Sequence, residues 1–154
     1  MTKILVLRVR GSMETRYSVE HALRQLKLTR KNHCVLVEET PSMQGTIKKA
    51  KDFITWGPAS KEVIAELLKK RGRVKGGKPL TDDYVAKNSK YKSIPEFAEA
   101  LASNEKMSAV KGLKEFFALN PPKGGFASIK KPLPEGALGK RDAKSMAELV
   151  LKML

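Results

Sequence analysis

The sequence contains few of the residues from which disulfides, metal centres and membrane segments are built. Its 154 residues include 1 cysteine and 2 histidines, so no disulfide can form within the chain and a cysteine-based zinc finger is excluded. No apolar run approaches the ~18 residues of a transmembrane helix, and the apolar start at residues 4–7 is too short for a secretory signal. We therefore expect an intracellular protein with no membrane segment, no metal and no cofactor.

The sequence is also poor in acidic residues, with 16 Asp and Glu against 31 Lys and Arg and a formal net charge of +15. Hydrophobic residues make up 41% of the chain, which is enough for a core, so a disordered basic tail is excluded. The positive excess lies in residues 1–80 and 121–154, whereas residues 81–120 contain as many acidic as basic side chains. This distribution favours a polyanion bound to one face, and basic side chains that are merely solvated are the alternative.

The first 57 residues alternate between strand and helix patterns. The apolar spacing predicts strands over 3–10, 34–37 and 53–56, and helices over 15–27 and 42–51. The first strand is apolar on both faces, so we expect it to be covered on both sides, and Ser42 is the expected cap of the second helix. The predicted fold class is α+β, a small β-α-β-α-β core with a mainly antiparallel sheet and its helices on one face.

The rest of the chain predicts a helical insertion and a long extension. Helices are expected from Ser60 to Arg71, from Thr81, and from Ser93 with Glu96 in a capping box. The basic loop 72–80 is expected to be flexible, and residues 113–119 are expected to add a strand. Proline and glycine exclude regular structure over about twenty residues of the segment 120–141, and Asp142 then caps a final helix. We expect three parts, a core domain (1–57), an insertion with the added strand (58–119) and an extension with the last helix (120–154).

Catalytic motifs receive little support. The segment 72–79, GRVKGGKP, resembles a phosphate-binding loop, but Pro79 stands where a Ser or Thr hydroxyl is needed and the segment follows a helix. Cys34 and His33 are neighbours on a strand, so their side chains point to opposite faces and cannot act together; a buried thiol is the better interpretation of Cys34. His21 has no ligand partner at the next turn of its helix. We predict that the protein is not an enzyme and has no small-molecule substrate.

Basic side chains recur at turns, at helix ends and in the long loop, as expected for a protein that neutralises phosphates. The candidate RNA-binding residues are Arg8, Arg10, Arg30, Lys31, Lys48, Lys49, Arg71, Arg73, Lys75, Lys78, Lys123, Lys130, Lys131, Lys140 and Arg141. The sequence has no aromatic RNP pattern and no zinc knuckle, so recognition of the shape of a folded RNA fits best. For Trp56 and the pair Phe116–Phe117 we favour core packing over base stacking.

Several segments carry a family resemblance. They are LRVRG (7–11), NHCV (32–35), TPSMQG (40–45), FITWG (53–57), PPKGG (121–125) and GKRD (139–142). In this order and spacing they resemble the large-subunit ribosomal protein family L-thirty, in its archaeal branch, whose eukaryotic counterpart is called L-seven. The resemblance implies a structural constituent of the large ribosomal subunit. Its partners would be large-subunit rRNA, close to where 5S rRNA attaches, and neighbouring ribosomal proteins.

Two positions depart from the family pattern. Gln44 stands where the family often has arginine before a glycine, so a charged contact there is either lost or becomes a neutral hydrogen bond. Lys123 replaces an arginine, which keeps the charge but loses the bidentate fork. Two other classes stay open, an RNA-directed enzyme or its basic accessory subunit and a DNA-compacting chromatin protein.

Overall fold

A single mixed sheet organises the molecule. The computed structural model describes residues 3–13, 15–103 and 105–154, and its sheet has the strand order β4-β2-β1-β3-β5. The strands are β1 (Lys3–Arg8), β2 (His33–Glu38), β3 (Ile54–Pro58), β4 (Phe116–Ala118) and β5 (Gly139–Lys140). All neighbours are antiparallel except β3 and β5. The prediction of an α+β fold with a mainly antiparallel sheet is confirmed.

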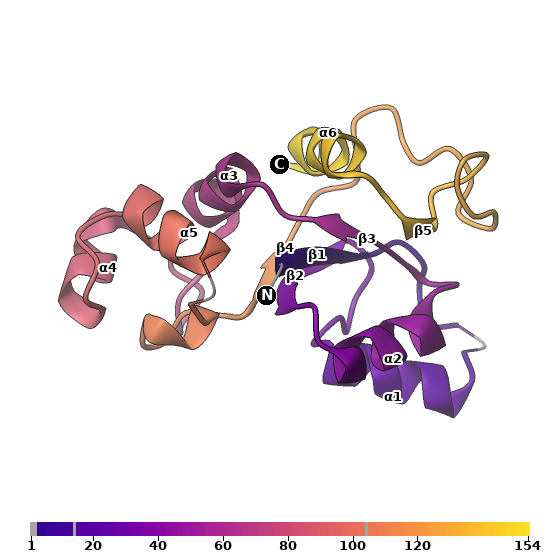
Figure 1. The fold of residues 1–154 in the computed structure, drawn as a ribbon, viewed down its shortest axis with the longest axis horizontal. Coiled ribbons are helices and arrows are strands. Elements are labelled where there is room, and N and C mark those ends of the chain that lie inside the picture. The colour runs from indigo at the N-terminus through magenta and orange to yellow at the C-terminus, as the bar shows by residue number, and fades with distance from the viewer. Residues whose placement is uncertain (1–2, 14, 104) are drawn as a thin grey trace.

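Helices cover both faces of this sheet (Figure 1). They are α1 (Tyr17–Gln25), α2 (Pro41–Ala50), α3 (Lys61–Arg71), α4 (Asp82–Asn88), α5 (Ile94–Ala102) and α6 (Ala143–Met153), with a short 3-10 turn η1 (Met107–Ala109). In Figure 1, α1 and α2 lie side by side on one face, α3 and α6 lie on the other, and α4 and α5 extend to one side. No helix in the described ranges is both long and apolar enough to traverse a bilayer.

The central strand β1 separates two apolar clusters. Ile4 and Val6 pack with residues of α1 and α2, whereas Leu5 and Leu7 pack with residues of α3, α5 and α6. This division follows from the alternation of side chains along a strand, and it confirms that β1 is covered on both sides. The prediction of helices on one face holds for α1 and α2 of the core, and the insertion and the extension cover the other face.

The start of α2 differs from the prediction. Thr40, not Ser42, is the N-cap, and its Oγ1 accepts a hydrogen bond from the Met43 amide at 3.2 Å. The reason is Pro41, whose fixed φ suits the first helical position and whose missing amide needs no partner there. The predicted caps Ser60 and Thr81 are confirmed by hydrogen bonds from the backbone amides of the third residue after each.

The predicted capping box of α5 is wrong. The Glu96 carboxylate accepts its hydrogen bond from the amide of Lys92 at 2.8 Å instead of that of Ser93. The amide of Ile94 donates to the Asp82 carboxylate at 2.8 Å. The first turn of α5 is therefore capped by a side chain of α4, which fixes these two short helices to each other.

The basic segment 72–80 is a closed turn and not the expected flexible loop. The Val74 amide donates to the Lys78 carbonyl at 2.9 Å. Gly76 and Gly77, which lie inside this turn, have φ angles of 89° and 79°. These positive angles are the reason that glycine occurs there. Val74 is buried and forms a bridge with Leu113, so the turn is tied to the core.

Residues 120–141 run mostly without regular structure, as predicted, except for the two residues of β5. Their backbone groups still find partners in this chain, including the Ala137 amide, which donates to the Ser128 carbonyl at 2.8 Å. Ala137 and Leu138 are buried in a small apolar cluster with Val9, just after β1. The extension is therefore attached to the carboxyl end of β1.

Candidate nucleic-acid interface

Basic side chains from separate parts of the sequence converge where β1 ends. Because β1 is antiparallel to β2 and β3, its last residues lie beside the first residues of both: Leu7 pairs with Cys34, and Arg8 with Ile54. The connections leading into β2 and β3 therefore meet there. We call the resulting set the basic end of the sheet: Arg10, Arg30, Lys31, Lys48 and Lys49. Arg10 is half-buried and the other four are exposed.

Local contacts and helix position explain the placement of Arg10, Lys48 and Lys49 in the basic end. Arg10 donates from Nη1 to the Asp52 carbonyl at 3.2 Å, and its guanidinium lies 4.9 Å from the centre of the Phe53 ring. Lys48 and Lys49 occupy the last turn of α2, where cations face the negative end of the helix dipole. The chain thus holds these charges at the surface with few competing carboxylates, which is the electrostatic requirement of a phosphate site.

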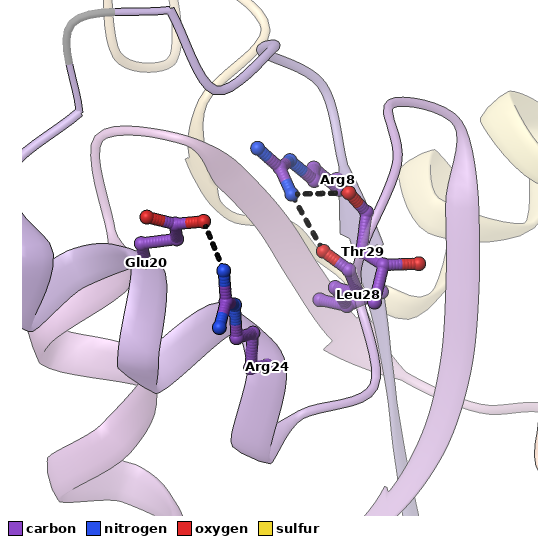
Figure 2. Close-up of polar contacts among 5 residues, drawn as sticks. All are labelled: Arg8, Glu20, Arg24, Leu28 and Thr29. Carbon is purple, nitrogen blue, oxygen red and sulfur yellow. Dashed lines mark hydrogen bonds and ion pairs between the residues drawn. The ribbon is translucent and has the colours of Figure 1, made fainter.

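Arg8 was predicted to contact phosphate, but the structure places it inside the protein. The residue is only 2% exposed. As Figure 2 shows, its Nη1 donates to the carbonyl oxygens of Leu28 at 2.7 Å and Thr29 at 3.0 Å; its Nε donates to the Arg10 carbonyl at 2.8 Å. Burial lowers the pKa of Arg8 from its ordinary value. Arg8 therefore serves the protein's own backbone, and we remove it from the interface.

Arg141 shows the same departure from the prediction. Its Nε donates to Thr55 Oγ1 at 3.0 Å, its Nη1 to Ser145 Oγ at 3.0 Å, and its Nη2 to the Ala137 carbonyl at 3.3 Å. Burial lowers its pKa as well. Arg141 joins β3, the extension and α6, so it too is removed from the interface.

A second basic group lies around the end of α3: Arg71, Arg73, Lys75, Lys78 and Lys123. Arg71 donates to the Leu154 carbonyl at 2.8 Å, and the Lys123 amide donates to the Lys152 carbonyl at 3.1 Å, so the ends of α3 and α6 meet the start of the extension. Lys75, Lys78 and Lys123 are exposed.

The strand β4 relates this second basic group to the basic end. Before β4, the Lys114 amide donates to the Arg73 carbonyl at 2.9 Å; after it, the Leu119 amide donates to the Asn32 carbonyl at 3.1 Å. Asn32 follows Arg30 and Lys31 directly in the chain. Arg73 of the second basic group and Arg30 and Lys31 of the basic end therefore lie near opposite ends of β4.

Lys140 lies apart from both sets, and Lys130 and Lys131 belong to the extension. β5, which contains Lys140, is at the opposite edge of the sheet from β4. Lys130 is exposed, and Lys131 forms an exposed ion pair with Glu135 at 2.9 Å. An exposed pair of this kind contributes little to stability and leaves the lysine available to another anion.

The aromatic residues mostly pack inside, as predicted. Phe117 is 1% exposed and lies in the apolar cluster that contains Leu5 and Leu7. Trp56 packs against the other cluster, beneath α1 and α2. Phe116 is half-buried and its ring stacks on that of His33 at 4.9 Å. Burial, with Arg30 and Arg8 nearby, lowers the pKa of His33.

Two surface residues near the basic end were missed in the sequence. Arg16 precedes α1 and is exposed, and Tyr17, its first residue, is 80% exposed. The signal was the helical stripe of α1, which begins at Val19 and leaves Tyr17 outside it. Gln44, where the family often has arginine, is exposed and donates to Glu39 Oε1 at 3.2 Å.

The described His, Cys, Asp and Glu residues were candidates for a metal site or a nucleophile. No group of three or more His, Cys, Asp or Glu in the described residues could hold a metal ion. Cys34 is fully buried, and burial raises the pKa of its thiol to about 12. This confirms Cys34 as a buried, unreactive thiol.

Comparison with known proteins gives this surface its context. The family model for ribosomal protein L30p/L7e matches residues 4–54. The large ribosomal subunit protein uL30 of Methanopyrus kandleri is 43% identical over 150 residues, covering 95% of this chain and 100% of the relative. The proteins of the same name from Methanocella arvoryzae and Methanobrevibacter smithii are 40% and 42% identical, over 96% of this chain and 97% and 99% of theirs. The predicted resemblance is confirmed: the chain belongs to the ribosomal protein L30p/L7e family, whose members are structural proteins and not enzymes.

Proposed function

We propose that this protein is a structural constituent of the large ribosomal subunit in the cytoplasm and binds folded rRNA through its basic end. The observation that carries the proposal is the convergence of Arg10, Arg30, Lys31, Lys48 and Lys49 at the end of β1. These charges come from three separate parts of the chain, so only the folded chain presents them together. Cations gathered on one folded surface suit the fixed phosphates of a folded RNA.

The proposed contact set is the predicted one without Arg8, which is buried, and Arg141, which is half-buried and bonded to protein groups. It comprises the basic end, the second basic group, and the lysines of the extension and β5, Lys130, Lys131 and Lys140. Tyr17 adds an exposed ring beside Arg16, and an unpaired base can stack on such a surface. We place the bound rRNA near the attachment region of 5S rRNA, with other large-subunit proteins as neighbours; the family resemblance supports this placement.

Salt-dependent binding tests the proposal. The purified protein should bind a fragment of its large rRNA, and log Kd should rise with log salt by roughly 0.7–0.9 for each phosphate contacted. The double variant Arg30→Gln, Lys31→Gln should bind more weakly and lose roughly 0.7–0.9 of that slope for each contact removed. The matched control is Lys87→Gln, Lys111→Gln, two exposed lysines in the charge-balanced part of the chain. Equal losses in both variants would contradict a localised interface.

Competition separates the proposal from the other two classes. An excess of random duplex DNA should not displace the rRNA fragment, because duplex DNA has a different groove shape. Equal competition would favour a chromatin protein. Turnover of an RNA substrate by the purified protein would favour the enzyme.

The single buried thiol makes the location of the bound RNA measurable. Because Cys34 is buried, an exposed cysteine introduced as Lys48→Cys is labelled selectively with an iron chelate that cleaves nearby RNA. In assembled large subunits we expect cleavage of the large rRNA close to where 5S rRNA attaches. A probe at Lys87→Cys is the control, and identical cleavage from both positions would contradict the placement.

A further inference from the structure

An apolar groove of about 430 Å³ lies beside β2, apart from the basic surfaces. Its floor includes Leu36 and Val37 of β2. One wall contains Leu26 and Met43, from the end of α1 and from α2, and the other contains Leu101 and Met107, from α5 and η1. The groove is therefore bounded by one structural layer on each face of the sheet.

The floor of the groove is an open edge of the sheet. β4 pairs with His33–Val35 only, whereas β1 pairs with β2 as far as Glu38. On the β4 side, Cys34 is opposite Phe117, and the Asn32 carbonyl accepts from Leu119. Because main-chain groups alternate along an antiparallel strand, those of Leu36 and Glu38 point to this same side.

The main-chain groups on this open edge are only partly used. The Glu38 carbonyl accepts from the Thr40 amide at 2.9 Å. Within the described residues, no main-chain hydrogen bond from another element reaches the amide or carbonyl of Leu36, or the Glu38 amide, on the β4 side. A free edge between apolar walls is the arrangement that receives an added strand.

The charges around the groove differ from those of the rest of the molecule. Lys3 pairs with Glu38 at 2.8 Å, and Lys27 pairs with Glu115. Lys106 is the one charged lining residue outside these two pairs. In a chain of net charge +15, this apolar surface with nearly equal positive and negative charge does not attract a polyanion. One carboxylate from a partner, placed beside Lys106, would neutralise the remaining positive charge of the groove.

We propose that the groove binds an extended segment of another protein, which pairs with Leu36–Glu38 and continues the line of β4. Successive side chains of such a strand point to opposite faces, so apolar residues would alternate between the Leu26–Met43 wall and the Leu101–Met107 wall. The segment carries a carboxylate for Lys106. The partner is a neighbour in the large subunit, and to that extent the inference rests on the proposed function.

Site-directed photocrosslinking in assembled large subunits tests this. Gln25 is exposed and lines the groove at the end of α1, so a benzophenone amino acid at this position reports on the occupant. We expect an adduct with one protein, mapped to one segment. Ser108→Trp places a bulky ring in the groove from an exposed position and should abolish the adduct. Ser103→Trp, exposed on the same α5–η1 connection but outside the lining, should leave it unchanged.

The other outcomes overturn the inference. An adduct with rRNA, an adduct with a second copy of this chain, no adduct, or a protein adduct that survives Ser108→Trp each excludes the proposed occupant. Binding to the rRNA fragment and sedimentation with the large subunit should be the same for the Ser108→Trp and Ser103→Trp proteins. If the protein with the crosslinker at Gln25 and with Ser108 unchanged sediments normally but forms no adduct, this inference alone is overturned, whereas absence of that protein from large subunits would overturn the proposed function too.

Discussion

Arg8 and Arg10 lie two residues apart at the end of β1, yet the structure uses them differently. Both continue the side of the strand that carries Ile4 and Val6. At Arg8 that side is still covered, and three backbone carbonyls surround the guanidinium. At Arg10 the strand has ended and the side chain reaches the surface. Arg8 is buried and Arg10 is not because strand pairing stops between them and because the chain at residues 28–29 folds back over Arg8. The alternation of side chains along a strand does not predict either feature.

Substitution of Arg8 should therefore affect stability before it affects RNA binding. Arg8→Gln leaves the buried carbonyl of Leu28 and the partly buried carbonyl of Thr29 without this donor, and an unsatisfied buried group costs about 1–3 kcal/mol. Arg10→Gln should change the free energy of unfolding by less than about 0.5 kcal/mol, as surface changes usually do, but should weaken rRNA binding. Urea unfolding of both variants measures the first effect. Equal stability of the two variants would show that the buried bonds of Arg8 contribute little.

At the scale of elements, α2 provides a direct test of how a helix begins. Thr40→Ala removes the side-chain acceptor of the Met43 amide and should cost about 1 kcal/mol, as loss of a threonine cap typically does. Ser42→Ala, the matched change at the exposed residue after Pro41, should stay within about 0.5 kcal/mol of the parent protein. Thermal or urea unfolding distinguishes them. A larger loss at Ser42 would mean that α2 begins there after all.

Elements with a strong local pattern were predictable, and those fixed by distant partners were less so. The stripe Val63, Ile64, Leu67 and Leu68 is buried in α3 as expected. β5 was missed because two residues after a Pro- and Gly-rich loop become a strand only through parallel pairing with β3. The candidate site divides likewise. Charge and turn position located the exposed lysines, but whether an arginine near a strand end bonds to protein carbonyls depends on tertiary folding.

At the scale of the whole molecule, charge and apolar surface are separated. The basic end lies where β1 ends and the second basic group lies around the end of α3, whereas the groove beside β2 is nearly balanced in charge. The insertion supplies one wall of that groove, and the residues 81–120 that build most of the insertion have no net charge. The fold can therefore meet RNA and protein at different places. The division into three parts stays a prediction. Residues of all three parts contribute to the apolar cluster that contains Leu5 and Leu7, so the parts share one core.

The extension is the part of the molecule in which an effect of assembly should be most visible. Residues 133–141 are tied to the protein by Arg141 and by the cluster with Val9. Lys123 and Lys130 precede this tied stretch and are exposed. Trypsin should therefore cut the free protein first after Lys123 and Lys130, and assembled subunits should resist, because bound rRNA covers the segment.

The turn that contains Lys75 supplies the internal comparison for this experiment. Lys75 and Lys123 are both exposed, and the amide of each donates to a carbonyl, that of Lys123 to Lys152 at 3.1 Å and that of Lys75 to Gly112 at 2.8 Å. The turn around Lys75 is in addition closed by the bond from the Val74 amide to the Lys78 carbonyl at 2.9 Å. Cleavage requires local unfolding of such a turn, so it should be slower. Mass spectrometry of timed digests gives the order of cuts, and Lys123→Gln, Lys130→Gln should remove the early fragments. A first cut after Lys75 would contradict the expected accessibility of the extension in the free protein, and equal rates for free and assembled protein would show that rRNA does not cover the extension.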